Sequence, residues 1–153
     1  MSIRLTPAEA WDVLGRAHTG ILTTLRADGA PVTLPTWFVV LDRTICFRTP
    51  TRARKVARIR RDPRASFLVE SGLRWAELRA VHVSGHVQLI EDHAARARIA
   101  SALDEKYASY RTAAADLPAS ASDRYKDWAF FRFVPGPRLL TWDNSRMSVT
   151  ATS

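Results

Sequence analysis

The segment between residues 20 and 49 is predicted to form three successive β-strands joined by tight turns, and this pattern most limits the possible fold. The first strand follows Gly20 and leads into the pair Asp28-Gly29, which is typical of a hairpin turn. The second strand covers residues 32–41, turns at Asp42-Arg43 and returns as residues 44–49. Strands joined by such short turns pair antiparallel, so we expect a meander.

Pro35 lies within the second of these strands. Proline has no N–H to donate to a neighbouring strand, so in sheets it is found at edges and bulges. We therefore expect an edge or a bulge at Pro35, where a ligand could approach the backbone.

Local patterns predict the remaining elements. Thr6 and Glu9 carry the signature of a capping box, with Pro7 at the first helical position, so a helix is expected over residues 7–18. The other predicted elements are helices at 50–62 and 92–110, strands at 65–70 and 76–91, a loop at 111–122, and closing strands at 130–134 and 139–142 around a turn at Pro135-Gly136-Pro137.

Short strands in hairpin order, flanking helices and no repeating βαβ pattern predict a mainly β protein built as a closed or split antiparallel barrel, not a Rossmann sheet. The 153 residues are enough for one domain. We expect its core to cover about residues 6–144, and the small, polar residues 145–153 to be flexible.

Two observations bear on the compartment in which the protein works. No apolar run approaches the roughly 18 residues of a membrane span, and the first residues lack the apolar core of a signal peptide. The single cysteine, Cys46, lies in an apolar run and is expected to be a small core residue. We therefore expect a cytoplasmic protein with no membrane partner.

The net charge of +8 suggests an anionic partner. The densest basic cluster runs from Arg52 to Arg64, on the predicted helix that follows the third strand. A helix N-terminus carries free N–H groups and a partial positive charge, so Arg54 and Lys55, with the Thr49 hydroxyl beside them, would suit a phosphate. The alternative is that the arginines form a solvated helix face.

No standard arrangement of catalytic residues is found, and neither a catalytic residue nor a metal site is predicted. The sequence lacks GxSxG, HExxH and CxxC motifs and a Gly-rich phosphate loop. His82 and His86 share one face of a strand but lie roughly 13 Å apart, which favours packing or a dimer interface over metal binding. An anion site without acid–base residues suggests a bound cofactor that performs the chemistry itself.

Three segments of the chain are similar to a known family. Residues 49–64 contain a strand ending in Thr, a helix with an Arg-Lys pair and then Asp-Pro-Arg. This segment resembles the pyridoxamine-phosphate-oxidase-like split β-barrel family of flavin and deazaflavin proteins. Residues 20–31 resemble the opening hairpin of that family, and residues 135–143 its closing strand. The resemblance covers roughly residues 6–144.

The resemblance implies a homodimer that holds a cofactor in a groove between its subunits. It implies that the phosphate is bound by Arg54 and Lys55, and that the ring lies along the strand of residues 33–38. Arg48 and Thr49 match further positions on the phosphate and ribityl side, and Arg52 or Arg58 would meet an anionic tail if they lie near the groove. The cofactor-binding residues expected in this way are Thr33, Leu34, Pro35, Thr36, Trp37, Arg48, Thr49, Arg54, Lys55 and Arg58.

Departures from the vitamin B6 oxidases argue against activity on pyridoxamine phosphate. Those enzymes carry a flavin-binding Gln on the long strand, where this sequence has Ala80, and their C-terminal Arg and His substrate residues have no match here. The short, Arg-rich chain looks more like the actinobacterial reductases that use the deazaflavin coenzyme F420, whose phosphate and oligoglutamate tail suit a charge of +8.

The expected function is therefore an F420-dependent reductase that transfers hydride to an unsaturated or quinone-like small molecule. FMN is the alternative cofactor. The alternative function is an FMN- or haem-binding carrier or sensor, for which His82 or His86 would be a haem ligand. A nucleic-acid-binding barrel is the least favoured reading of the basic helix and the five Trp residues, and no nucleic-acid partner is expected.

Overall fold

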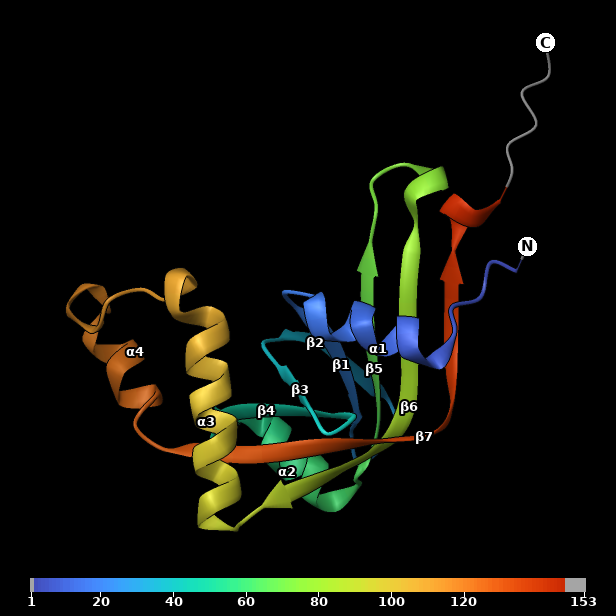
Figure 1. Ribbon diagram of the computed structural model, residues 1–153. Coiled ribbons are helices and arrows are strands. Elements are labelled where there is room, and N and C mark those ends of the chain that lie inside the picture. Colours follow the sequence, from blue (N-terminus) through green and yellow to red (C-terminus); the bar gives the residue numbers. More distant parts are fainter. Residues whose placement is uncertain (1, 148–153) are drawn as a thin grey trace.

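The computed structural model describes residues 2–147 of the chain. Seven antiparallel strands form one curled sheet in the order β2-β1-β5-β6-β7-β4-β3, with helices beside it (Figure 1), and the expected mainly β split barrel is confirmed. No helix within the described residues is long and apolar enough to span a membrane. The strands are β1 (Gly20–Leu25), β2 (Pro31–Thr36), β3 (Val39–Leu41), β4 (Thr44–Pro50), β5 (Arg64–Ser71), β6 (Arg79–Ile90) and β7 (Trp128–Asp143). The α-helices are α1 (Pro7–Arg16), α2 (Arg54–Arg61), α3 (His93–Tyr107) and α4 (Ala119–Arg124).

The strand expected over residues 32–41 is broken at Trp37-Phe38, and the predicted meander is wrong. β2 pairs with β1 at one edge of the sheet, whereas β3 pairs with β4 at the opposite edge. The chain leaves the sheet at one edge after Thr36 and rejoins it at the opposite edge at Val39, so the barrel is split at this point instead of being closed by one continuous strand. Pro35 lies on an edge strand, as expected, because β1 is the one strand paired with β2 among the described residues.

The two closing strands expected around Pro135-Gly136-Pro137 are one strand, β7. Val83 of β6 is opposite Leu139, but Gly85 is already opposite Pro135, so residues 136–138 bulge out of the ladder instead of reversing the chain. Gly85 permits this close approach, because a Cβ atom there would lie 2.1 Å from the carbonyl oxygen of Val134.

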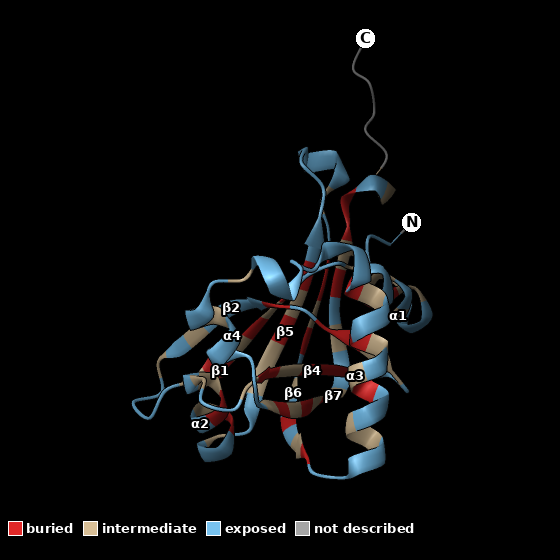
Figure 2. Ribbon diagram, turned by 90° about the vertical axis from the view of Figure 1, so that its left-hand side faces the viewer, coloured by how far each residue is buried: buried red, intermediate tan, exposed pale blue. Residues whose placement is uncertain are grey.

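The segment expected to be a loop at 111–122 is partly helical. It contains a 3-10 helix at Ala114–Asp116 and the start of α4. None of these helical residues is buried, as the colours of α4 in Figure 2 show. Beside α3 at one end of the molecule, α4 therefore contributes nothing to the core (Figure 1).

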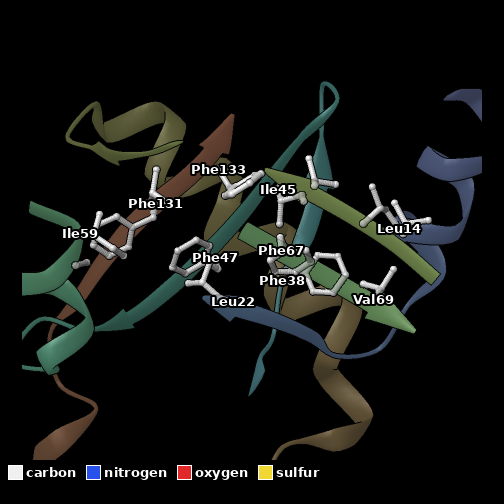
Figure 3. Close-up of a cluster of buried hydrophobic side chains, with 14 of the residues drawn as sticks. Leu14, Leu22, Phe38, Ile45, Phe47, Ile59, Phe67, Val69, Phe131 and Phe133 are labelled. Atoms are coloured by element: carbon white, nitrogen blue, oxygen red, sulfur yellow. The ribbon is translucent and has the colours of Figure 1, made fainter. Parts of the chain in front are cut away.

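The curl of the sheet encloses the main hydrophobic core (Figure 3). Helix α1 closes one side of it with Ala10 and Leu14. A second cluster lies where α3 packs on the outside of β3 and β4, and Cys46 is buried in it as the expected core residue. The fully buried phenylalanines of the main core are Phe38, Phe47, Phe67, Phe131 and Phe133.

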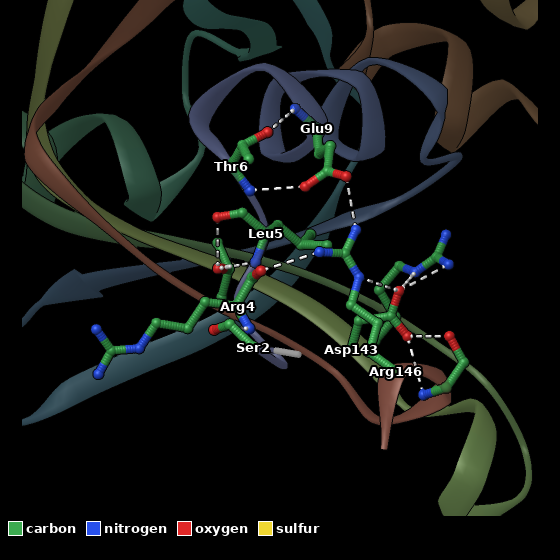
Figure 4. Close-up of polar contacts among 10 residues, drawn as sticks. Ser2, Arg4, Leu5, Thr6, Glu9, Asp143 and Arg146 are labelled. Carbon is green, nitrogen blue, oxygen red and sulfur yellow. Dashed lines mark hydrogen bonds and ion pairs between the residues drawn. The ribbon is translucent and has the colours of Figure 1, made fainter. Parts of the chain in front are cut away.

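Polar contacts fix the start of α1 to the end of the described chain (Figure 4). The expected capping box is present: the Thr6 hydroxyl accepts from the Glu9 N–H, and the Glu9 carboxylate accepts from the Thr6 N–H at 2.7 Å. Arg146 donates to the same carboxylate at 2.6 Å, and these contacts, that of Arg146 first, lower the pKa of Glu9 to about 2. Arg146, which belongs to the tail expected to be flexible, is thus held by Glu9, while residues 148–153 of that tail lie outside the described residues.

Candidate functional site

The N-terminus of α2 presents unneutralised positive charge. The chain enters it directly from β4, through residues 51–53. The residue before the helix, Ala53, has no side chain that could accept from the first helix amides, and the first turn contains no acid. Free amide N–H groups and the helix dipole therefore favour an anion at this point.

A cavity of about 860 Å³ opens at this helix start. One wall is the loop after β4 with the first residue of α2, and the other is the end of α4 with the connection to β7. The Thr51 N–H donates to the Asp127 carbonyl at 3.0 Å and ties the two walls together. The cavity is lined by four cations, Arg52, Arg54, Arg124 and Lys126, and by two acids, Asp123 and Asp127.

Arg124 and Lys126 were missed by sequence reasoning. They lie some 70 residues after the basic helix, in a segment with no regular pattern. The register of β4 with β7, which sets Pro50 opposite Trp128, brings them to the cavity. That pairing is a property of the sheet and leaves no local signal in the sequence.

The predicted phosphate pair, Arg54 and Lys55, is positioned at the start of α2. Arg54 is exposed and lines the cavity. Lys55 is half-buried, with its Nζ 5.9 Å from the Phe47 ring centroid, and burial together with the nearby Arg58 lowers the pKa of its amine. Within residues 2–147, no ion pair joins either side chain to an acid. Both cations are thus available to an anionic ligand.

Arg58 is used differently from what the sequence suggests. Its Nε donates to the Thr24 hydroxyl at 2.9 Å, and Arg61 donates to the Leu25 carbonyl at 2.9 Å. These two arginines tie α2 to β1, so the alternative of a fully solvated arginine face is wrong for them. Arg58 does not line the cavity, and the contact expected between Arg58 and a cofactor stays a prediction.

Arg48 and Thr49 lie on opposite faces of β4. The Thr49 side chain is buried with the core-facing residues of the strand. The Arg48 side chain projects from the other face, where its guanidinium lies 4.6 Å from the Trp128 ring centroid and donates to Asp104 at 2.9 Å. Because neighbouring side chains of a strand alternate, these two do not converge on one site.

The edge strand β2 carries the other expected cofactor residues. Thr33, Leu34 and Pro35 are exposed, and Thr36 is buried. The free edge of β2 offers backbone groups that a planar ligand could approach. The structure thus brings the expected ring-binding strand to a free edge and the expected phosphate residues to the start of α2.

Four aromatic side chains surround the point where the chain leaves β2. Here they are called the aromatic cluster, and they are His18, Trp37, Tyr107 and Tyr110. The Trp37 ring stacks on Tyr107 with centroids 4.3 Å apart and an interplanar angle of 1°. Helix periodicity places Tyr107 on the apolar side of α3 with Ile99 and Leu103, but it does not show what the hydroxyl contacts.

Tyr107 and its neighbour Lys106 hold the Trp37-Phe38 link. The Tyr107 hydroxyl accepts from the Phe38 N–H at 2.9 Å and donates to the His18 carbonyl at 2.7 Å. The Lys106 ammonium donates to the carbonyls of Ala17 and Phe38 at 2.7 and 2.8 Å, and burial lowers the pKa of its amine to about 8. Between β2 and β3 the backbone has no partner strand, and Lys106 and Tyr107 of α3 supply hydrogen bonds to it instead.

His82 and His86 lie on the outer face of the sheet, opposite Leu68 and Arg64 of β5. His82 is half-buried and His86 is exposed. Within residues 2–147, no three His, Cys, Asp or Glu side chains come close enough to hold a metal ion.

Comparisons with known proteins agree with this architecture. The sequence matches the family described as pyridoxamine 5'-phosphate oxidase over residues 6–135. No match was found among curated proteins. The conserved hypothetical protein Rv2991 from Mycobacterium tuberculosis is similar in structure, with 30% identity, a TM-score of 0.79, and coverage of 99% of this chain and 96% of that chain.

Two further solved structures share the fold at lower identity. An F420 reductase has 23% identity and a TM-score of 0.62, with coverage of 84% of this chain and 94% of that chain. The FAD-binding protein from Mycobacterium smegmatis has 22% identity and a TM-score of 0.66, with coverage of 92% of this chain and 98% of that chain. The names of these two structures refer to a deazaflavin and to a flavin cofactor, whereas another structure with this fold is of a heme binding protein from Mycobacterium smegmatis.

Proposed function

The chain belongs to the pyridoxamine 5'-phosphate oxidase family, and from that membership we propose that it is a reductase that uses coenzyme F420 to reduce an unsaturated or quinone-like small molecule. The basic cavity at the start of α2 carries the proposal. Its cations outnumber its acids by four to two, and the uncapped helix adds free amides. F420 has a phosphate and several carboxylates, whereas FMN has one phosphate, so a cavity with cations on both walls suits F420 better.

The residues of this chain bind and orient the cofactor, and none of them needs to exchange a proton with it. Arg54, which lines the cavity, and Lys55, which follows it on α2, hold the phosphate. On the opposite wall, Arg124 and Lys126 meet the oligoglutamate carboxylates, and Lys126 exchanges its ion pair with Asp123 for this contact. The free edge of β2 supports the ring. When bound, reduced F420 would supply the hydride and solvent the proton that completes reduction of the acceptor, so no protein nucleophile would be needed.

Titration at two ionic strengths tests the choice of cofactor. F420 is expected to bind more tightly as its oligoglutamate tail lengthens, and this advantage should shrink in high salt, because attraction between exposed charges is screened over about 8 Å at physiological ionic strength. The double variant Arg124→Ala, Lys126→Ala should lose most of the tail-length effect. Arg138→Ala, which removes an exposed arginine away from the cavity, is the matched control.

Two results would contradict F420 as the cofactor. One is tighter binding of FMN than of F420. The other is an affinity for F420 that does not change with tail length in the unaltered protein. A purified protein that carries a haem or flavin absorption band would point to the carrier or sensor function instead.

We also propose that the protein is a homodimer joined through the outer face of its sheet. On the outer face of the sheet, the strand register places five residues without a carboxylate, lysine or arginine side by side across β2, β1, β5, β6 and β7. Here they are called the apolar row, and each of them is half-buried or exposed. The neighbouring row contains only Thr and Ser. An uncharged face can pack against its own copy about a two-fold axis, which removes its apolar atoms from water. The apolar row consists of Pro35, Ile21, Leu68, His82 and Leu140.

A charge at the centre of this row is expected to separate the subunits. Sedimentation at micromolar concentration should show a dimer for the unaltered protein and a monomer for Leu68→Asp, since two carboxylates would be buried at the interface. Leu73→Asp, which alters a fully exposed leucine outside the row, should remain dimeric. A monomeric unaltered protein would contradict both the interface and a cofactor groove between subunits.

A further inference from the structure

Trp37 presents one ring face to solvent while its other face is covered. The side chain is 39% exposed, although large aromatic side chains are mostly buried. Tyr107 stacks on one face, because the two rings are parallel with their centroids 4.3 Å apart. The exposed fraction therefore belongs mainly to the opposite face and the outer rim of the indole.

The covered face is held rigidly. Tyr107 has no exposed surface, and its hydroxyl is fixed by the Phe38 N–H and the His18 carbonyl. Lys106 fixes the Phe38 carbonyl, next to Trp37 in the chain. A ligand that stacks on the indole would lose little of its binding energy to ordering this ring.

Polar groups lie beside this flat face. The His18 ring meets Trp37 at 5.9 Å and Tyr110 at 4.4 Å, in both cases edge to face. His18 and Tyr110 are exposed, so an imidazole nitrogen and a phenol hydroxyl can bond to a ligand oxygen. Lys106, whose ammonium lies 5.1 Å from the Tyr107 ring centroid, already donates to two carbonyls. The surface therefore suits a neutral, planar molecule with oxygen substituents, not an anion.

We propose that the exposed face of Trp37 is the stacking site for the acceptor, a planar conjugated carbonyl compound of the quinone type. The inference rests on the proposed reductase function, for which it names the place and class of the substrate. Trp37 directly follows the edge strand β2, along which the cofactor ring is proposed to lie, so an acceptor stacked there would lie beside that ring. His18 and Tyr110 bind its carbonyl oxygens.

Binding of menadione, a naphthoquinone, to the cofactor-free protein tests this site. The chain has five Trp residues, so the ¹H–¹⁵N spectrum should contain five indole signals, and the Trp37 signal is the one missing from Trp37→Leu. Menadione is expected to shift this signal and to bind about tenfold more weakly to Trp37→Leu, which keeps an apolar cover over Tyr107 but removes the aromatic face. Trp75→Leu, at a tryptophan that is 62% exposed, is the control and should bind like the unaltered protein.

The outcomes separate this inference from the proposed function. Equal affinity of Trp37→Leu and the unaltered protein, or an equal loss in Trp75→Leu, would overturn the stacking site. It would also be overturned if Trp37→Leu weakened F420 binding but not menadione binding, since Trp37 would then belong to the cofactor site. Binding of menadione at Trp37 by a protein that binds neither F420 nor FMN would uphold the stacking site and refute the proposed cofactor.

Discussion

Alanine at Arg54 or at Lys55 is expected to weaken F420 binding about 10- to 150-fold, because a charge-assisted contact with phosphate contributes about 1.5–3 kcal/mol. Neither side chain is paired with an acid within the described residues, and Arg54 lines the cavity. The loss should be similar for F420 and FMN, since both carry the phosphate. Dissociation constants from fluorescence titration measure it.

The matched control is Arg60→Ala. Arg60 is exposed on the same helix and bears the same charge, but it lies in the last turn, away from the cavity. Its removal tests whether the general positive field, and not a direct contact, attracts the cofactor. Equal losses in Arg60→Ala and Arg54→Ala would contradict a phosphate site at the start of α2. Because Lys55 is half-buried near Phe47, its variant also requires a check of the melting temperature.

Features set by a few neighbouring residues could be predicted from the sequence. The capping box of Thr6 and Glu9 needs only three residues of spacing, and the turn at Gly29 needs a residue with φ of +84°, which glycine adopts without strain. The buried side of α2, Val56 and Ile59, follows from helical periodicity. In each case the interacting residues are only a few positions apart in the sequence.

Features set by distant partners could not be predicted. Residues 32–41 read as one strand because their composition favours extended backbone on both sides of Trp37-Phe38. The break exists because the two halves pair with different edges of the sheet, and this depends on β1 and β4. The second wall of the cavity, with Arg124 and Lys126, is likewise set by the pairing of β4 with β7.

Tyr107→Phe is expected to lower the free energy of unfolding by about 2 kcal/mol or more. The substitution removes one oxygen and leaves the Phe38 N–H and the His18 carbonyl without their partner, and an unpaired buried polar group costs about 1–3 kcal/mol. The phenyl ring still stacks on Trp37, so loss of packing does not contribute. Urea denaturation of both proteins measures the difference.

Tyr110→Phe is the control for this change, because it removes the same atom from a tyrosine that is 61% exposed. Its stability should stay within about 0.5 kcal/mol of the unaltered protein, as expected for a surface substitution. A similarly small effect of Tyr107→Phe would show that water satisfies the Phe38 amide, and the Tyr107 hydroxyl would then not be what holds the link between β2 and β3. A large effect would show that the Tyr107 hydroxyl is needed, beside the two hydrogen bonds of Lys106, to hold the Trp37-Phe38 link and with it the position of Trp37.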